Sequence, residues 1–243
     1  MEKIKIKKGE HLIAIGDTHG RNLWEKIVEK EIKADKIIFM GDYFDTHDDV
    51  SVKKQIENFE KILAFKKANM KKVVLLIGNH DFHYLTTAQE TYSGFSGNNF
   101  NDINEILQPA IEEKLLQMCF VHKKYLFTHA GVTKTWVNNS LIDLDNIQDS
   151  INEKFLTEPN MFRFNIGVNG DNSGDDVTQG PIWVRIPSLL LNMVIGYTFV
   201  VGHSTIKELT IREKLIGIDT IGTSGEYLEI INLIPKAKKI TDD

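Results

Sequence analysis

Short apolar runs alternate along the chain with longer stretches in which apolar residues recur at helical spacing. Five of these runs have the length and the β-branched or aromatic content of buried strands. They cover residues 12–15, 37–40, 73–77, 125–127 and 198–201. Three stretches between the early runs place apolar residues on one helical face, starting near Leu23, Ile56 and Ile103. This alternation predicts an α/β fold that begins with βαβ units.

The second half of the chain is predicted to be richer in strands. Two further apolar runs, residues 215–218 and 227–233, predict a closing hairpin around residues 222–225. Residues 84–101 and 165–180 are rich in Gly, Ser, Asn and Thr, which predicts loops. Because loops of this length in a compact domain are usually functional, we expect these two to set specificity.

Length and charge narrow the picture further. We predict that residues 1–243 form one domain, with a flexible tail at residues 235–243. The chain has 29 Lys and Arg against 34 Asp and Glu, a net charge of −5, so we expect neither nucleic acid nor membrane as a partner. No apolar stretch approaches the roughly 18 residues of a membrane span, and the first residues lack a signal-peptide core. A cytoplasmic location is therefore expected.

Cys119 is the single cysteine, which excludes an internal disulfide and a Cys-based zinc site. We expect this thiol to be a small buried hydrophobe, and we expect Trp183 to belong to the core. Candidate chemistry must therefore come from carboxylates, imidazoles and amides.

Polar residues follow each of the first five apolar runs, and each of these segments contains a glycine. The segments are Gly16-Asp17-Thr18-His19, Gly41-Asp42-Tyr43-Phe44-Asp45, Gly78-Asn79-His80-Asp81, Thr128-His129-Ala130-Gly131 and Gly202-His203. In open α/β sheets, ligands bind outside the carboxyl ends of the strands. We therefore expect seven side chains to converge: Asp17, His19, Asp42, Asn79, His80, His129 and His203.

Such a cluster of acids and imidazoles needs a compensating cation. Oxygen and nitrogen ligands without a thiolate suit Mn²⁺, Fe or Zn²⁺. The set is too large for one tetrahedral zinc and sufficient for two ions that keep waters. Two metals about 3.5–4 Å apart serve in-line displacement at phosphorus.

The ordered series of motifs is similar to that of the calcineurin-like metallophosphoesterase superfamily, with the pattern D-x-H, G-D-x-x-D, G-N-H-[DE], H and G-H across residues 16–203. The resemblance implies a four-layer α/β/β/α sandwich with a dinuclear metal site at the carboxyl ends of the strands. It also implies a phosphoric ester hydrolase in which a metal-bridging hydroxide attacks phosphorus in line.

Within the superfamily, the chain resembles the serine/threonine phosphoprotein phosphatase branch of bacterial and phage type. Thr205 stands where phosphodiesterase branches have a second His after G-H, and residues 217–220 resemble a late strand of the phosphatase branch. The chain departs from the eukaryotic members of the branch, because Thr46-His47 follows Asp45 where they have Arg-Gly. That phosphate-holding arginine is therefore absent.

The resemblance assigns roles to the motif residues. His80 is the general acid, oriented by Asp45, and a leaving alkoxide does need a proton from such a group. For Asp45, capping of a helix that begins near Thr46 is the alternative. Asp81 is expected to be a structural acceptor. The implied metal ligands are Asp17 and His19 for the first ion, Asp42 for both, and Asn79, His129 and His203 for the second.

Phosphate binding is assigned to Asn79 and to an arginine. Among Arg21, Arg163, Arg185 and Arg212, we favour Arg185, which lies between the last two His motifs; Arg163 is its competitor. A surface salt bridge is an equal alternative for Arg185. Four other histidines fit no motif and are expected at the surface, with His47 and His83 nearest the site rim: His11, His47, His83 and His122.

The sequence thus predicts an enzyme with two divalent ions, Mn²⁺ first and Fe or Zn²⁺ as alternatives. Its substrate would be a phosphorylated protein, with phosphoserine or phosphothreonine, or a small phosphoester. A hydrolase of dinucleoside polyphosphates or other nucleotides is the alternative. A catalytically inactive module that binds phospho-ligands is a third reading, and intact Asp42, Asn79 and His80 argue against it.

Overall fold

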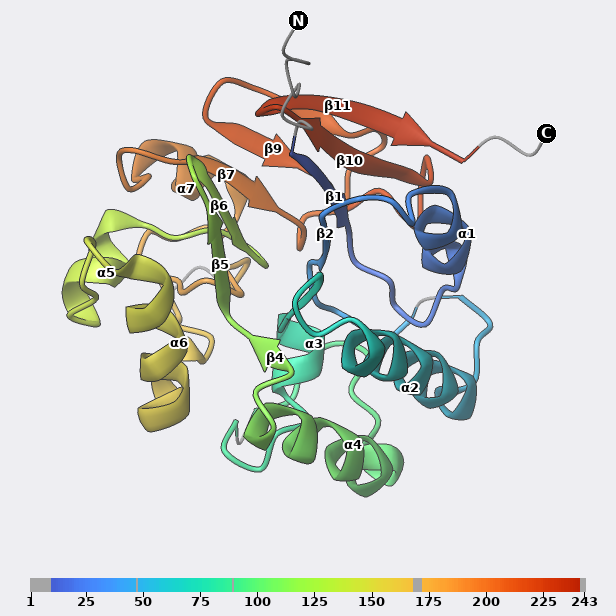
Figure 1. Ribbon diagram of the computed structural model, residues 1–243. Coiled ribbons are helices and arrows are strands. Elements are labelled where there is room, and N and C mark those ends of the chain that lie inside the picture. Colours follow the sequence, from blue (N-terminus) through green and yellow to red (C-terminus); the bar gives the residue numbers. More distant parts are fainter. Residues whose placement is uncertain (1–9, 47, 89, 168–171, 241–243) are drawn as a thin grey trace, which may run out of the picture.

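The computed structural model describes residues 10–46, 48–88, 90–167 and 172–240, which form two β-sheets flanked by helices (Figure 1). The first sheet has the order β11-β10-β1-β2-β3-β4 and the second has the order β5-β6-β7-β9-β8. The strands of the first sheet are β1 (His11–Ile15), β2 (Lys36–Phe39), β3 (Val73–Leu76), β4 (Leu116–Gln117), β10 (Glu226–Ile231) and β11 (Ile234–Lys239). Those of the second are β5 (Cys119–His122), β6 (Tyr125–Thr128), β7 (Thr198–Val201), β8 (Thr210–Ile211) and β9 (Leu215–Gly217).

The sheets pack face to face through an apolar layer. Successive residues of a strand point to opposite faces, so in β1 Leu12 and Ala14 face the other sheet while Ile13 and Ile15 belong to the cluster beneath the helices. This explains why the strands are continuous apolar runs, since both faces are buried. The buried layer between the sheets includes Leu12, Ala14, Ile38, Met40, Val74 and Leu76 from one sheet and Tyr125, Phe127, Val200 and Ile216 from the other.

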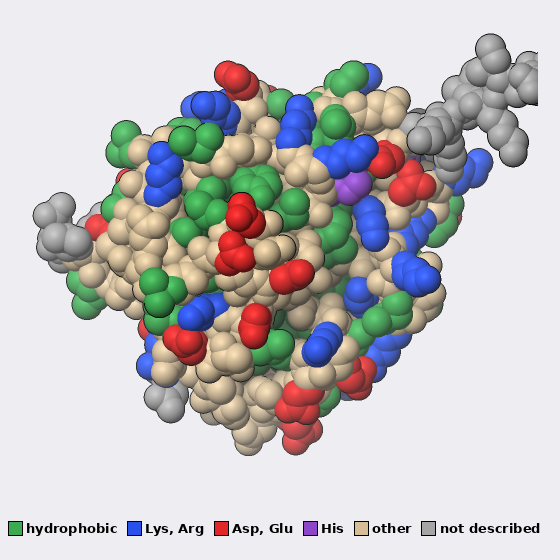
Figure 2. Space-filling view, turned by 60° about the vertical axis from the view of Figure 1, so that its left-hand side comes forward, with side chains coloured by type: hydrophobic (Ala, Val, Ile, Leu, Met, Phe, Trp, Pro, Cys, Tyr) green, Lys and Arg blue, Asp and Glu red, His purple; other side chains and the backbone are tan. Residues whose placement is uncertain are grey.

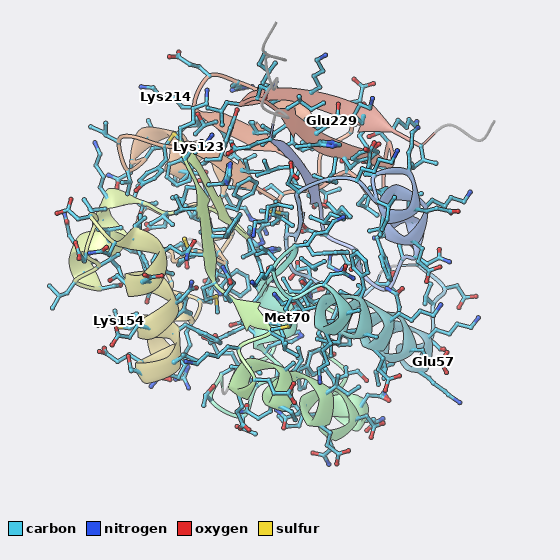
Figure 3. The ribbon with its side chains drawn as sticks, in the orientation of Figure 1. Glu57, Met70, Lys123, Lys154, Lys214 and Glu229 are labelled. Carbon is cyan, nitrogen blue, oxygen red and sulfur yellow. The ribbon has the colours of Figure 1, made fainter. Side chains whose placement is uncertain are left out.

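Helices cover the outer faces of both sheets, which confirms the predicted α/β/β/α layers. The helices are α1 (Leu23–Lys30), α2 (Val52–Ala68), α3 (Asn79–Phe82), α4 (Phe100–Glu112), α5 (Lys134–Asn139), α6 (Ile147–Thr157) and α7 (Ile186–Leu191), with 3₁₀ turns η1 (Gly97–Asn99) and η2 (Pro159–Phe162). On α1, Trp24 packs against Phe39 of β2 with ring centroids 5.7 Å apart. On α6, the Asn152 side chain accepts hydrogen bonds from the backbone N–H groups of Met118 and Cys119, each at 2.9 Å. On α2, Glu57 points away from the sheets (Figure 3).

Parallel pairing brings the carboxyl ends of the central strands to one edge. In the first sheet β1 pairs with β2 and β2 with β3; in the second, β6 pairs with β7, all parallel. The segments that follow these five strands therefore leave from the same edge, as expected for ligand sites in α/β sheets.

Two predictions about the last third of the chain are wrong. Residues 215–218 and 227–233 do not form a hairpin, because β9 pairs with β7 and β8 in one sheet while β10 pairs with β1 in the other. The tail predicted at residues 235–243 is a strand as far as Lys239, paired along its length with β10. As an edge strand, β11 is largely exposed, so its polar Lys236-to-Lys239 segment does not show the apolar pattern of a strand. Residues 241–243 lie outside the described part.

None of the described helices is both long and apolar enough to cross a membrane. On the face in Figure 2, several acidic side chains lie near the middle, and basic side chains lie mostly to the right and along the upper edge. The buried positions expected for Cys119 and Trp183 are confirmed.

Candidate functional site

A polar cluster lies where the five strand-end segments meet. A cavity of about 470 Å³ opens over it. All seven side chains predicted to converge do so: Asp17 and His129 are buried beneath the cavity, and the other five line it. The cavity is lined by His19, Arg21, Asp42, Asn79, His80, Ser93, Arg185, His203, Thr205, Asp219 and Gly222.

Two buried carboxylates form the floor of the cluster. Asp17 is 1 % exposed and Asp42 is 2 % exposed. The backbone N–H of His203 donates to Oδ2 of Asp17 at 2.8 Å, and that of His80 donates to Oδ1 of Asp42 at 2.9 Å. Oδ1 of Asp17 is buried without a hydrogen-bond partner among the described residues. One carboxylate oxygen is therefore left for a ligand from outside the chain.

Glycine is required beside both carboxylates. A Cβ on Gly78 would lie 2.0 Å from Oδ1 of Asp42, and a Cβ on Gly202 would lie 2.0 Å from Oδ1 of Asp17. No larger residue fits at either position without displacing the acid. The G-N-H and G-H motifs thus have a steric reason for their glycines.

Backbone carbonyls set the tautomers of three histidines. Nδ1 of His19 lies 2.6 Å from the carbonyl of Phe44, Nδ1 of His129 lies 2.8 Å from that of Met40, and Nε2 of His203 lies 3.0 Å from that of Trp183. A carbonyl only accepts, so each of these nitrogens carries the proton, and the other nitrogen of a neutral ring presents a lone pair. This arrangement is typical of histidines that bind metals.

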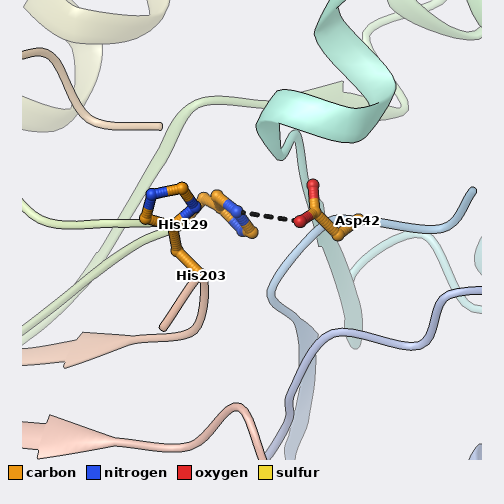
Figure 4. Close-up of side chains that lie close together, drawn as sticks. All are labelled: Asp42, His129 and His203. Atoms are coloured by element: carbon orange, nitrogen blue, oxygen red, sulfur yellow. Dashed lines mark ion pairs between the residues drawn. The ribbon is translucent and has the colours of Figure 1, made fainter. Parts of the chain in front are cut away.

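The lone pairs point at other acceptors. Nε2 of His129 lies 3.1 Å from Oδ1 of Asn79 and 3.3 Å from Oδ2 of Asp42 (Figure 4), and Nδ1 of His203 lies 2.9 Å from the same Oδ1 of Asn79. Acceptors so close to one another repel unless a cation or an added proton lies among them. Together with the orphaned oxygen of Asp17, this geometry fits a divalent cation.

Asp42 belongs to two groups of potential ligands. Ligand atoms of Asp42, His129 and His203 all lie within 4.8 Å of one another, and so do those of Asp17, His19 and Asp42. Carboxylate, imidazole and amide donors in this combination suit Mn²⁺, Fe and Zn²⁺. The cluster can therefore hold divalent metal.

Mutual electrostatics shift the pKa values of the cluster. Burial and the nearby Asp219 carboxylate raise the pKa of Asp17 well above its usual value. Burial also acts to raise the pKa of Asp42, but His129 and His80 outweigh it and hold that pKa well below the usual value. Burial disfavours a charged His129, yet Asp42 and Asp17 raise its pKa to about 10. In the metal-free chain, a proton on His129 thus takes part of the compensating role of a cation.

Four residues of the site adopt left-handed backbone conformations that only glycine adopts without cost. The φ angles are +43° for His19, +52° for Asp42, +60° for Asp45 and +62° for His203. Such strain is of order 1–3 kcal/mol per residue and persists where the surrounding structure holds it. The backbone here is set to place side chains rather than to minimise local energy.

His80 and Asp45 form a pair at the edge of the cavity. Nδ1 of His80 lies 3.0 Å from Oδ2 of Asp45, and the Tyr84 hydroxyl donates to Oδ1 of Asp45 at 2.6 Å. Burial disfavours a charged His80, but Asp42 and Asp45 together raise its pKa. Asp45 does not cap the next helix: α2 begins at Val52, and its N-cap is Ser51.

The surface position expected for His83 is wrong. Its side chain is fully buried, stacked on Tyr92 and edge-on to Phe95, with Nε2 2.6 Å from Oδ2 of Asp45. The backbone N–H of Tyr92 donates to Nδ1 at 3.3 Å, which leaves the proton of a neutral ring on Nε2, facing Asp45. His83 is buried because aromatic residues of the 84–101 loop fold over it.

The other histidines outside the motifs lie away from the cavity or outside the description. His11 and His122 are partly exposed, and their Nε2 atoms lie 3.2 Å from Glu229 and 3.1 Å from Glu10. His47, predicted near the rim, lies outside the described residues.

Asp81 is a structural acceptor, as expected. Its carboxylate accepts from the backbone N–H groups of Gly78 at 2.9 Å, Asp42 at 2.8 Å and Tyr43 at 2.7 Å. Burial and the Asp42 charge raise its pKa to about 7. The residue ties the second strand-end segment to the third.

The two candidate phosphate-binding arginines lie in different places. Arg185 lines the cavity, where Nη1 donates to the carbonyl of His203 at 3.0 Å and Nε donates to that of Ser173 at 3.2 Å. Arg163 is not among the residues that line this cavity, and its Nη2 donates to the carbonyl of Thr87 at 3.1 Å.

Sequence reasoning assigned no role in the site to two charged residues that line the cavity, Asp219 and Arg21. Asp219 is 5 % exposed and accepts from the Thr205 hydroxyl at 2.7 Å. Thr205 occupies the place of the missing second His, and its hydroxyl fixes the Asp219 carboxylate. Arg21 was one of the four arginines considered for phosphate binding but was not the one favoured, although it directly follows the first motif.

Comparison with known proteins identifies relatives of this arrangement. A family model described as calcineurin-like phosphoesterase matches residues 11–204. No curated protein matches the chain by sequence. Three solved structures share its fold at low sequence identity, with coverage given first for this chain and then for the other. The first is a cold-active protein tyrosine phosphatase, with 18 % identity, a TM-score of 0.55 and coverage of 94 % and 78 %. The second is a protein described as a putative diadenosine tetraphosphatase, with 15 % identity, a TM-score of 0.53 and coverage of 96 % and 94 %. The third is a protein serine/threonine phosphatase from Saccharomyces cerevisiae with similarity to human PP5, with 13 % identity, a TM-score of 0.54 and coverage of 98 % and 82 %.

Proposed function

The chain belongs to the calcineurin-like phosphoesterase family and is a hydrolase, and from this premise we propose that it cleaves phosphate monoesters of the phosphoserine or phosphothreonine type. The observation that supports this most directly is the arrangement around Asp42. That carboxylate is shared by two groups of ligand side chains, and the His80–Asp45 pair borders the same cavity.

The residues of the cluster divide into two proposed ligand sets. Asp17, His19 and Asp42 would hold one cation; Asp42, Asn79, His129 and His203 would hold another. We expect Mn²⁺, with Fe or Zn²⁺ as alternatives. When bound, two such ions supply Lewis acidity toward phosphoryl oxygens and lower the pKa of water.

The proposed role of His80 is to give a proton to the leaving oxygen. Hydrolysis breaks the bond between phosphorus and the ester oxygen, and an alkyl alkoxide is too basic to leave without a proton. Asp45 favours the protonated ring and aims its Nδ1–H, so that Nε2 is free to face the substrate. Tyr84 and His83 in turn hold Asp45 in place.

Substrate recognition is assigned to Asn79 and Arg185, which both line the cavity. The two loops expected to set specificity each reach the site: Ser93 lines the cavity, and the carbonyl of Ser173 accepts from Arg185. A cavity of about 470 Å³ is larger than a phosphate group needs, so part of the esterified alcohol would also enter it. The net charge of −5 supports a substrate other than nucleic acid, and we propose that the protein acts in the cytoplasm.

Activity assays test the proposal directly. Chelation should abolish hydrolysis of an aryl phosphate, and added Mn²⁺ should restore it. Rates measured side by side on a phosphoserine peptide, diadenosine tetraphosphate and a bis-aryl diester should favour the peptide. A preference for diadenosine tetraphosphate would assign the chain to the nucleotide hydrolases of the family, and hydrolysis that persists without metal would refute the mechanism.

A further inference from the structure

A second guanidinium lines the cavity besides that of Arg185. It belongs to Arg21, which lies in the segment between β1 and α1, directly after the Asp17–Gly20 motif. The backbone N–H of Arg21 donates to the carbonyl of Thr18 at 2.8 Å, which closes a tight turn. The turn fixes the start of the side chain beside the metal-ligand cluster.

The guanidinium of Arg21 is held from two further sides. Its Nε lies 2.7 Å from Oδ2 of Asp48, and its planar end lies against Gly222. A Cβ on Gly222 would be 2.9 Å from both Cζ and Nη2 of Arg21. The missing side chain of Gly222 therefore makes the space in which the guanidinium lies.

This fixation matters for anion binding. A long side chain that is already held loses less conformational entropy when it binds a ligand. Asp48 is half exposed, so water screens its ion pair with Arg21 and the pair is weak. Asp48 therefore helps to position the guanidinium but does not cancel its positive charge. Nε of Arg21 faces Asp48 and one N–H of Nη1 faces the carbonyl of Thr18 at 3.5 Å, so Nη2 and the second N–H of Nη1 are the donors that Arg21 can offer to a ligand in the cavity.

Arg185 alone offers only part of its donor set. Its Nε and one N–H of Nη1 already donate to the carbonyls of Ser173 and His203. A phosphate group has several oxygens to satisfy, and acidic residues line the cavity as well, among them Asp42 and Asp219. A second guanidinium in the cavity would offset the repulsion between these acids and the phosphate.

We propose that Arg21 is a second phosphate-binding residue of this site, held in position by Asp48 and by the space beside Gly222, and that it contacts the phosphate of the substrate ester. The inference rests on the proposed function and extends it by naming a residue outside the motifs. It assigns to the β1–α1 segment a direct part in substrate binding.

The first test measures binding of inorganic phosphate by calorimetry to the Mn²⁺-loaded protein. Arg21→Ala should weaken binding by about tenfold to a hundredfold, because charge-assisted hydrogen bonds are lost. Arg21→Lys should show an intermediate loss, since an ammonium cannot bind two oxygens through a planar fork. Arg212→Ala removes an exposed arginine in the turn before β9 and should change nothing. Phosphate affinity within twofold of the parent chain in both Arg21 variants would overturn the proposal.

A second test moves the guanidinium without removing it. Gly222→Ala should displace the end of Arg21 and raise the KM for phenyl phosphate. In the Arg21→Ala background, the same substitution should add no further loss. If the two losses add in full, Gly222 acts independently of Arg21 and the assigned place of the guanidinium is wrong.

The outcomes separate this inference from the proposed function. A parent chain that hydrolyses no phosphoester would refute the function, whereas the phosphate titration would still test Arg21. An active parent chain whose Arg21→Ala variant keeps full phosphate affinity would refute the Arg21 assignment alone. Thermal unfolding of each variant confirms that the measured losses come from folded protein.

Discussion

Two clusters of acids and histidines lie at opposite ends of strand β1. At the carboxyl end, Asp17 lies beside His19 and Asp42; at the amino end, His11 lies beside Glu31 and Glu229. In both clusters the potential ligand atoms lie within 4.8 Å of one another. Figure 3 labels Glu229 on β10, in the first sheet near the ends of the chain.

The two clusters differ in what already satisfies their charges. At the amino end, the Tyr227 hydroxyl donates to Glu31 at 2.7 Å, Lys238 lies 3.8 Å from Glu229, and His11 lies 3.2 Å from Glu229. The chain thus supplies a donor for Glu31 and a cation for Glu229, although Nε2 of His11 is buried without a hydrogen bond among the described residues. At the carboxyl end, backbone carbonyls fix the tautomers of His19, His129 and His203, and the free ring nitrogens of His129 and His203 face the oxygen of Asn79. The cavity gives a ligand access to this cluster. Proximity of potential ligand residues is therefore not enough to make a metal site. The two clusters differ in that acceptors at the carboxyl end face one another without a cation between them.

The largest expected effect, and the strongest test of the difference between the two clusters, is loss of the Asp42 carboxylate. Asp42→Asn should lower kcat/KM for an aryl phosphate by about a thousandfold or more and reduce the bound metal, because both ligand sets lose a charged member. Glu229→Gln should leave both quantities unchanged. If Asp42→Asn and Glu229→Gln lowered activity equally, the assignment of the catalytic centre to the carboxyl-end cluster would be wrong.

Removal of His80, the proposed general acid, is expected to have the next largest effect. His80→Gln should slow hydrolysis of phenyl phosphate by about 10²–10⁴-fold, with metal content retained. With a nitrophenyl ester the loss should be much smaller, since that leaving group needs little protonation. A loss independent of the leaving group would remove His80 from the proton-transfer role.

The Asp45 carboxylate should reveal itself in the pH profile. Burial lowers the pKa of His80, whereas the charges of Asp42 and Asp45 raise that pKa. Loss of the Asp45 charge should therefore lower the pKa of His80. A general acid works only while protonated, so Asp45→Asn should move the alkaline limb of kcat to lower pH. A limb at the same pH in both proteins would contradict the pairing.

Asp81 tests the scaffold beneath the carboxyl-end cluster. Asp81→Ala would leave the N–H groups of Gly78, Asp42 and Tyr43 without their buried acceptor, at a cost of about 3 kcal/mol or more in the free energy of unfolding. Urea unfolding measures this change. Asp145→Ala, at an exposed site, should stay near the parent value.

The smallest effect is expected at the amino-end cluster. His11→Gln should lower the free energy of unfolding by about 1 kcal/mol or less, because it removes a partly exposed side-chain contact with Glu229. Phosphoesterase activity should be unchanged. A smaller stabilisation by added Mn²⁺ in this variant than in the parent chain would show that the amino-end cluster does hold metal.

The carboxyl-end cluster was predictable from the sequence because its signal is local. Each ligand follows an apolar run, and Gly78 and Gly202 mark the places where the backbone must approach a carboxylate. The layered arrangement came from the resemblance, since alternation alone indicates only an α/β fold.

The features that could not be predicted from the sequence depend on contacts between segments that are far apart along the chain. Periodicity cannot tell which sheet a strand joins, so β9 and β10 were paired wrongly, and an exposed edge strand such as β11 lacks an apolar pattern. His83 is buried only because Tyr92 and Phe95 fold over it from a loop without regular structure. The guanidinium of Arg21 lies where it does because a glycine about 200 residues later leaves room.

The proposed metal ligands come from both sheets: Asp17, Asp42 and Asn79 follow strands of the first sheet, and His129 and His203 follow strands of the second. Cations bound there would crosslink the two layers of the sandwich, so occupancy and resistance to unfolding are linked by mass action. Metal supply would then govern how long the folded chain survives proteolysis, as well as how fast it turns over substrate.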